Sequence, residues 1–207
     1  MAATLSLLAL AILATLAGAS SRDCPPCGGT EIPYPLSTSS NCGDPDYKLY
    51  CNNNSLEFLS VGGTPHPVLS INPEAYRLII HVPAIDMNVC SSSDLFEGGL
   101  KIDESSPFNI SNRNTVMLFD CNETILFSPL NCSSNSLCRK FEETEEGSAC
   151  RDTLCCTYLK DSRMTSHRIR IRVGGCTAYT SVVDIDPNDP PSLWNFGIEL
   201  QWLPRRT

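Results

Sequence analysis

The arginines near the C-terminus are the residues of this sequence whose type and spacing best suit the binding of an anion. From residue 168 to residue 173, Arg alternates with Ile or Val, so in a strand the arginines would share one face, roughly 6.5–7 Å apart. Guanidinium groups can hold carboxylates in bidentate fashion. The alternative is an ordinary solvated strand face, balanced by the acids of residues 142–146. The candidate ligand-binding residues are Lys160, Arg163, His167, Arg168, Arg170 and Arg172.

The 12 cysteines are a second set of residues with chemistry of their own. A cytosolic protein of this size rarely keeps so many thiols, whereas an exported protein uses them as disulfides. We therefore expect six disulfides and no metal site. Adjacent cysteines rarely bond to each other, so Cys155 and Cys156 should reach separate partners and fix one strand from both sides. The expected disulfide cysteines are Cys24, Cys27, Cys42, Cys51, Cys90, Cys121, Cys132, Cys138, Cys150, Cys155, Cys156 and Cys176.

Motifs of known catalytic chemistry are missing from the sequence. It contains no G-x-S-x-G, no H-E-x-x-H and no Gly-rich phosphate loop with its lysine. Cys24 and Cys27 have the C-x-x-C spacing of redox sites, but no thioredoxin-like βαβ pattern surrounds them, so a structural role is favoured. The 23 acidic residues leave open a glycosidase pair of carboxylates. We expect a protein without enzymatic activity and without a cofactor.

The N-terminal residues indicate export. An apolar run from residue 5 to residue 16 precedes Ala-Gly-Ala at residues 17–19, which is typical of a signal peptide. No later apolar stretch is long enough to span a bilayer, and a net charge of −8 argues against nucleic acid as a partner. We expect a secreted glycoprotein, with N-glycosylation at the four Asn-x-Ser/Thr motifs of Asn53, Asn109, Asn122 and Asn131.

Short segments with strand periodicity predict a mainly β fold of short strands and long loops, stapled by disulfides. Paired glycines and 15 prolines separate these segments. Near the C-terminus, alternation places Ile198, Leu200 and Trp202 in the core. The same alternation places Glu199 and Gln201 in solvent.

The distribution of charge suggests two modules after the signal peptide of residues 1–19. Residues 22–150 hold 7 Lys+Arg and 17 Asp+Glu, a balance of −10, whereas residues 151–207 hold 8 and 6, a balance of +2. The four glutamates within residues 142–146 are interpreted as a solvated connector. We expect cysteine-rich β modules at residues 20–141 and 142–207.

The order of short motifs along the chain carries a further signal. The first half contains Cys24-x-x-Cys27-Gly28, Ile32-Pro33-Tyr34-Pro35-Leu36, Cys42-Gly43, Tyr47-Lys48-Leu49-Tyr50-Cys51, Val68-Leu69-Ser70-Ile71, Pro107-Phe108-Asn109-Ile110 and Phe119-Asp120-Cys121. The second half contains Cys155-Cys156-Thr157-Tyr158, Gly175-Cys176-Thr177-Ala178-Tyr179, Trp194 and Gly197-Ile198-Glu199-Leu200-Gln201-Trp202. In this order, the motifs resemble the galacturonan-binding domain and ectodomain of plant wall-associated receptor kinases and kinase-like proteins.

That resemblance implies non-catalytic binding of pectic polysaccharide (galacturonan) in the plant cell wall, where the arginine row would face carboxylates. Leu36 stands where the family often has phenylalanine, and no EGF-like stretch, transmembrane helix or kinase domain follows Trp202. We therefore expect an isolated extracellular ectodomain, either truncated or secreted, of a family whose members are anchored in the plasma membrane. The alternative is a secreted structural or protein-interaction module without carbohydrate affinity.

Overall fold

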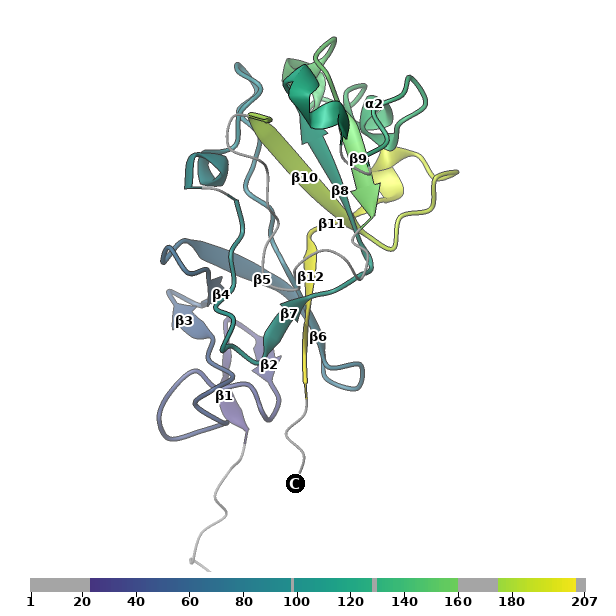
Figure 1. Ribbon diagram of the computed structural model, residues 1–207. Coiled ribbons are helices and arrows are strands. Elements are labelled where there is room, and N and C mark those ends of the chain that lie inside the picture. Colours follow the sequence, from purple (N-terminus) through teal and green to yellow (C-terminus); the bar gives the residue numbers. More distant parts are fainter. Residues whose placement is uncertain (1–22, 98, 128–129, 160–174, 204–207) are drawn as a thin grey trace, which may run out of the picture.

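The computed structural model describes residues 23–97, 99–127, 130–159 and 175–203. These residues form three antiparallel sheets joined by long loops (Figure 1). The mainly β fold with short strands that the sequence predicts is confirmed. The predicted signal peptide lies outside the described residues. So do the six predicted ligand-binding residues between positions 160 and 172, which are called the basic row below.

The largest of these sheets has six strands, and a four-stranded sheet lies above it in the view of Figure 1. The six-stranded sheet consists, in spatial order, of β3 (Tyr50–Asn52), β4 (Ser55–Leu59), β5 (Pro65–Asn72), β6 (Arg77–Ile80), β12 (Ile198–Trp202) and β7 (Phe108–Ile110). The four-stranded sheet consists of β11 (Asn195–Phe196), β10 (Ala178–Val183), β8 (Asn114–Phe119) and β9 (Cys156–Leu159). The two-stranded sheet consists of β1 (Cys24–Cys27) and β2 (Thr30–Ile32).

Helices are short and lie in the connections between strands. The α-helix is α2 (Leu137–Phe141), and the 3-10 helices are Ser93–Glu97, Glu123–Phe127, Ser148–Cys150 and Pro191–Leu193. In α2, Phe141 packs against Phe119 of β8, with 5.3 Å between ring centroids. Helix α2 thereby joins the core of the four-stranded sheet, whose central strands β8 and β10 are buried along their whole length.

Strand pairing connects distant parts of the chain. β12, at the C-terminal end, lies between β6 and β7, and β8 lies between β9 and β10. Both larger sheets therefore contain strands from either side of residue 142. The division into modules at that residue stays a prediction.

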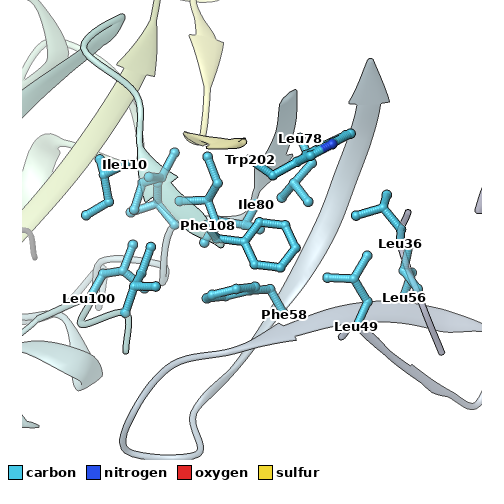
Figure 2. Packing of buried hydrophobic residues seen from close by; sticks show 14 of the residues in the cluster. Leu36, Leu49, Leu56, Phe58, Leu78, Ile80, Leu100, Phe108, Ile110 and Trp202 are labelled. Atoms are coloured by element: carbon cyan, nitrogen blue, oxygen red, sulfur yellow. The ribbon is translucent and has the colours of Figure 1, made fainter. Parts of the chain in front are cut away.

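The core of the six-stranded sheet is built around Phe108 (Figure 2). Its ring makes edge contacts with Phe58, Tyr47 and Trp202, at centroid distances of 5.5, 6.2 and 6.4 Å. Such pairs add roughly 0.5–1.5 kcal/mol each to the area that they bury. The predicted burial of Ile198, Leu200 and Trp202 is confirmed.

The prediction that Glu199 faces solvent is wrong, because its side chain is buried between two arginines. Its carboxylate lies 3.5 Å from Arg77 of the neighbouring strand β6 and 3.3 Å from Arg113, just before β8. Arg113 also pairs with Asp184. Alternation correctly places Glu199 on the face opposite Leu200, but Arg77 and Arg113 cover its carboxylate on that face. Gln201 is partly exposed.

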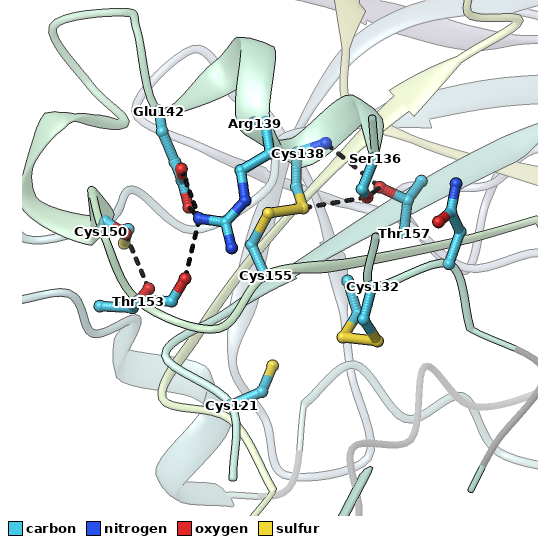
Figure 3. The surroundings of a disulfide bond; sticks show 12 residues. Cys121, Cys132, Ser136, Cys138, Arg139, Glu142, Cys150, Thr153, Cys155 and Thr157 are labelled. Atoms are coloured by element: carbon cyan, nitrogen blue, oxygen red, sulfur yellow. Dashed lines mark hydrogen bonds and ion pairs between the residues drawn. A yellow bond between two sulfur atoms is a disulfide. The ribbon is translucent and has the colours of Figure 1, made fainter. Parts of the chain in front are cut away.

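All 12 cysteines are paired, as the even count predicts. The disulfides are Cys24–Cys42, Cys27–Cys51, Cys90–Cys150, Cys121–Cys176, Cys132–Cys156 and Cys138–Cys155. The structural role of the C-x-x-C pair is thus confirmed. The adjacent pair reaches two different partners: Cys155, just before β9, is bonded to Cys138 of α2, and Cys156 of β9 is bonded to Cys132 (Figure 3).

The prediction of a solvated glutamate run is wrong at its first residue. Glu142 is buried at the end of α2, and Arg139 donates to its carboxylate at 2.9 Å and to the carbonyl of Thr153 at 2.9 Å (Figure 3). Burial raises the pKa of Glu142, and the ion pair with Arg139 opposes that shift. Glu143, Glu145 and Glu146 are exposed.

Candidate functional site

The six residues predicted to bind the ligand, at residues 160–172, lie outside the described residues. The four predicted glycosylation asparagines lie within them. Asn53, Asn122 and Asn131 are exposed, and Asn109 is partly exposed on β7. Their glycosylation and the basic row both stay predictions.

A pocket of about 440 Å³ lies between residues 46–50, the β4–β5 hairpin and residues 102–108. Its volume falls in the range of small-ligand sites, roughly 300–1,000 Å³. Its floor is apolar, since Phe58 and Phe108 are buried core residues. Its rim is polar and carries Lys48, Tyr50, Ser60, Asp46, Asp103 and Ser106. This first pocket combines an apolar base with hydrogen-bonding and charged groups.

Lys48 and Tyr50 form the most defined feature of the first pocket. The chain is extended here, so Tyr47 and Leu49 point into the core while Lys48 is exposed and Tyr50 partly exposed. The hydroxyl of Tyr47 donates to the carbonyl of Leu203 at 2.5 Å, which fixes this segment against the C-terminal strand. The ammonium of Lys48 lies 4.9 Å from the centroid of the Tyr50 ring. This is a cation–π geometry, worth about 0.5–1 kcal/mol at an exposed site.

The carboxylates of the first pocket limit what it can bind. Asp46 and Asp103 line it with Lys48, so the formal charge of these three groups is −1. Asp103 accepts hydrogen bonds from the backbone and hydroxyl of Ser105, at 2.8 and 2.7 Å. A carboxylate ligand must therefore approach Lys48 directly, whereas the aspartates suit hydroxyl donors. The arrangement fits an acidic, hydroxylated ligand better than a simple anion.

A second pocket of about 190 Å³ lies on the other side of the β4–β5 hairpin. It is lined by Thr64, His66, Asp94, Gly99 and Lys101, and it shares Ser60 and Val61 with the first pocket. His66 comes from β5 and Asp94 from the 3-10 helix Ser93–Glu97, and both are buried. Lys101 is exposed. This pocket thus has buried polar groups inside and a cation at its edge.

Burial shifts the titration of both buried groups in the second pocket. It lowers the pKa of His66, and a hydrogen bond to the backbone of His81 and the charge of Asp94 oppose that change. Burial raises the pKa of Asp94, opposed by the hydroxyl of Tyr179, which donates to its Oδ2 at 2.6 Å, and by the charge of His66. Burial and Asp94 also raise the pKa of Tyr179, so this hydroxyl keeps its proton.

Among the described residues, no group of three or more His, Cys, Asp or Glu side chains is placed to hold a metal ion. No helix in that part of the chain is long and apolar enough to cross a membrane.

Comparison with protein families adds an independent finding. Residues 24–82 match the family described as wall-associated receptor kinase galacturonan-binding. Residues 24–82 of this chain belong to that family. The match covers β1 to β6 and two residues beyond.

The relatives extend the similarity beyond the galacturonan-binding module. Wall-associated receptor kinase-like 20 of Arabidopsis thaliana is 38% identical over 189 residues, which is 88% of this chain and 29% of that protein. Wall-associated receptor kinase-like 15 of the same plant is 37% identical over 191 residues, 87% of this chain and 30% of that protein. The chain thus spans less than a third of the length of these relatives. No solved structure matches it.

Residues 24–82, which match this family, supply most of the first pocket, including Lys48, Tyr50 and Ser60, while Asp103 and Ser106 come from outside the matched residues. The sequence marks Lys48 and Tyr50 only as part of a family motif and not as binding residues. The alternation of Tyr47, Lys48, Leu49 and Tyr50 is the signal that could have placed both side chains on an open face.

Proposed function

We propose that this protein binds pectic polysaccharide in the plant cell wall, outside the cell and without catalysis. The match of residues 24–82 to the galacturonan-binding family carries this proposal. The ligand is a polymer of galacturonic acid, whose sugar units each offer a carboxylate and several hydroxyl groups. The first pocket offers matching groups on the same module.

Each part of the first pocket has a role in this binding. The ammonium of Lys48 pairs with a uronate carboxylate, and the ring of Tyr50 packs against an apolar face of the sugar. Asp46 and Asp103 accept hydrogen bonds from sugar hydroxyls, and Ser60 and Ser106 can donate or accept. With a net charge of −8 on the protein, attraction of a polyanion depends on such local cations, so binding weakens as salt increases.

Removal of the Lys48 charge tests the proposal in the full chain. We expect Lys48→Gln to weaken binding to de-esterified polygalacturonate by roughly fivefold, because exposed ion pairs contribute about 1 kcal/mol or less. Lys140→Gln is the matched control. This partly exposed lysine lies on α2, which packs against the four-stranded sheet, and it donates to the carbonyl of Pro187. Affinity electrophoresis at low and high salt measures both variants.

Other outcomes would contradict the proposal. A wild-type protein that binds neither polygalacturonate nor methyl-esterified pectin would favour a structural or protein-interaction module. Release of reducing ends from pectin would indicate a hydrolase. If Lys48→Gln binds as tightly as Lys140→Gln, the site lies elsewhere.

The basic row is the alternative location for the same binding function. A triple change of Arg168, Arg170 and Arg172 to Ala tests it in the same assay. Loss of binding in this variant alone would assign the main contact to that row. Loss in Lys48→Gln alone would assign it to the galacturonan-binding module.

A further inference from the structure

The tip of the β4–β5 hairpin forms a ridge between the two pockets. Ser60 and Val61 line both of them. The backbone N–H of Val61 donates to the carbonyl of Lys101 at 2.8 Å, and the N–H of Gly63 donates to the carbonyl of Ser60 at 2.9 Å. Gly63 has φ +80°, a conformation that suits glycine, so the turn is compact. A ligand chain that crosses this fixed ridge can enter both pockets.

Asp94 gives the second pocket an unused acceptor. Its side chain is 95% buried, since the residue is 5% exposed. Its Oδ2 accepts from Tyr179, and its Oδ1 has no hydrogen-bond partner of normal geometry among the described residues, although the side chain of Ser92 lies close enough to lower the pKa of Asp94. Buried polar atoms are nearly always hydrogen-bonded, and an unpaired one costs roughly 1–3 kcal/mol. A hydroxyl donor from a ligand would remove that cost.

His66 adds a second polar group beside Asp94. The residue is 2% exposed, and its imidazole is hydrogen-bonded to the backbone of His81. In its neutral form the ring has one N–H donor and one nitrogen acceptor. The N–H is directed to the backbone of His81. A ligand hydroxyl that donates to Oδ1 of Asp94 would lie beside this imidazole.

Lys101 supplies a positive charge for the carboxylate of a sugar acid. It is exposed at the edge of the pocket, and its backbone is held by the hairpin tip through Val61. Its ammonium can pair with a carboxylate while the hydroxyls of the same sugar reach Asp94 and His66. The two pockets therefore share a pattern of one lysine with one or more acidic side chains.

We propose that the second pocket is a second uronate subsite, so that one galacturonan chain crosses the hairpin tip with neighbouring sugars near Lys48 and Lys101. This inference rests on the proposed function. It predicts that a chain binds more tightly than a single sugar acid, because the second sugar binds at a high effective concentration once the first is held. Specificity for de-esterified chains follows, because both lysines need a free carboxylate.

The dependence of affinity on ligand length tests the second subsite. Galacturonic acid and de-esterified oligogalacturonides of increasing length are titrated calorimetrically against the full chain. We expect affinity to rise steeply once the oligomer is long enough to reach both pockets. In Lys101→Gln and Asp94→Asn, we expect the extra affinity of long oligomers over the monomer to fall by about tenfold, whereas Lys140→Gln keeps the wild-type rise.

The experiment separates failure of the second subsite from failure of the proposed function. If Lys101→Gln keeps the wild-type rise with length while Lys48→Gln weakens binding, the second subsite is wrong and pectin binding stands. If the wild type binds no oligomer, both proposals fail. Should Asp94→Asn fold poorly, the exposed Lys101 still decides the matter, since its side chain contributes little to the core.

Discussion

At the scale of single residues, His66 makes the stability of the fold depend on pH. Its imidazole is buried between β5 and the 3-10 helix Ser93–Glu97, which lowers its pKa below the ordinary value of 6.5. As the pH falls below 6.5, the unfolded chain takes up a proton that folded His66 does not. Stability therefore declines from pH 6.5 down to the folded pKa.

Asp94 has the opposite effect on the same region. Its pKa is raised above the ordinary value of 3.8. As the pH rises above 3.8, the unfolded carboxyl loses a proton that the folded one keeps, so stability declines up to the folded pKa. The titration of Asp94 thus makes the folded state more stable in acid, whereas the titration of His66 makes it more stable near neutrality.

Replacement of His66 should remove its part of the pH dependence. His66→Gln keeps an N–H donor for the backbone of His81 but cannot take up a proton. We expect its free energy of unfolding to fall less between pH 7.5 and pH 5.5 than that of the wild type, as measured by urea denaturation at each pH. His81→Gln is the control, because His81 is exposed. An unchanged slope in His66→Gln would refute this assignment.

At the scale of elements, Asn114 continues a strand ladder where β7 has ended. Its side-chain amide accepts from the backbone N–H of Glu199 at 2.8 Å and donates to the carbonyls of Glu199 and Ser111, both at 2.9 Å. The last pair between β7 and β12 is Ile110 with Leu200. Asn114, at the start of β8, thereby joins the four-stranded sheet to β12 of the six-stranded sheet.

Loss of the Asn114 amide should loosen the junction of the two sheets. Asn114→Ala leaves the buried N–H of Glu199 without its partner, and we expect a loss of about 2–3 kcal/mol in the free energy of unfolding. Asn195→Ala, an exposed asparagine on β11, should change it by less than about 0.5 kcal/mol. Denaturation by guanidinium measures both. Equal stabilities of the two variants would mean that the Asn114 amide does not strengthen the junction of the two sheets.

The junction also shows where prediction from the sequence succeeds and where it fails. Alternation alone places Ile198, Leu200 and Trp202 correctly, because a period of two depends only on the local strand. It fails for Glu199 because Arg113 and Asn114 approach from another sheet. Local periodicity states which residues share a face, but tertiary pairing decides what covers that face.

At the scale of the whole molecule, the site is less predictable than the fold. The cysteine count and the short alternating runs predict a disulfide-rich β protein, since composition and local pattern suffice for both. The two pockets need residues 46–50, the β4–β5 hairpin and residues 99–106 to meet. No pattern in the chain specifies that meeting, and the choice among many cysteine pairings likewise depends on the folded arrangement.

The disulfides form two separate sets along the chain, whereas the six-stranded sheet contains strands from both parts of the chain. Two bonds lie within residues 24–51, and the other four lie within residues 90–176. No disulfide joins these two sets, since all 12 cysteines are accounted for. The N-terminal part is held to the rest by the pairing of β12 with β6 and by the packing around Phe108. Apart from the backbone that joins the two parts, that attachment is non-covalent.

Digestion without reduction gives a direct test of this arrangement. Trypsin acting on the denatured, unreduced protein should leave three disulfide-linked groups, because cleavage after Lys48, Arg77, Lys101, Lys140 and Arg151 separates the cysteines as follows. Residues 23–48 stay linked to 49–77, and residues 78–101 stay linked to 141–151. Residues 114–139 stay linked to 152–160 and to the peptide that holds Cys176.

Mass spectrometry before and after reduction identifies the groups, and thiol titration of the denatured protein should read near zero. Reduction should unfold the native protein, since each bond contributes about 2–4 kcal/mol. A peptide from residues 23–77 bonded to one from residues 78–176 would contradict the pairing. It would also mean that the N-terminal part is joined to the rest by a disulfide, so that the pairing of β12 with β6 and the packing around Phe108 would no longer be what holds the two together.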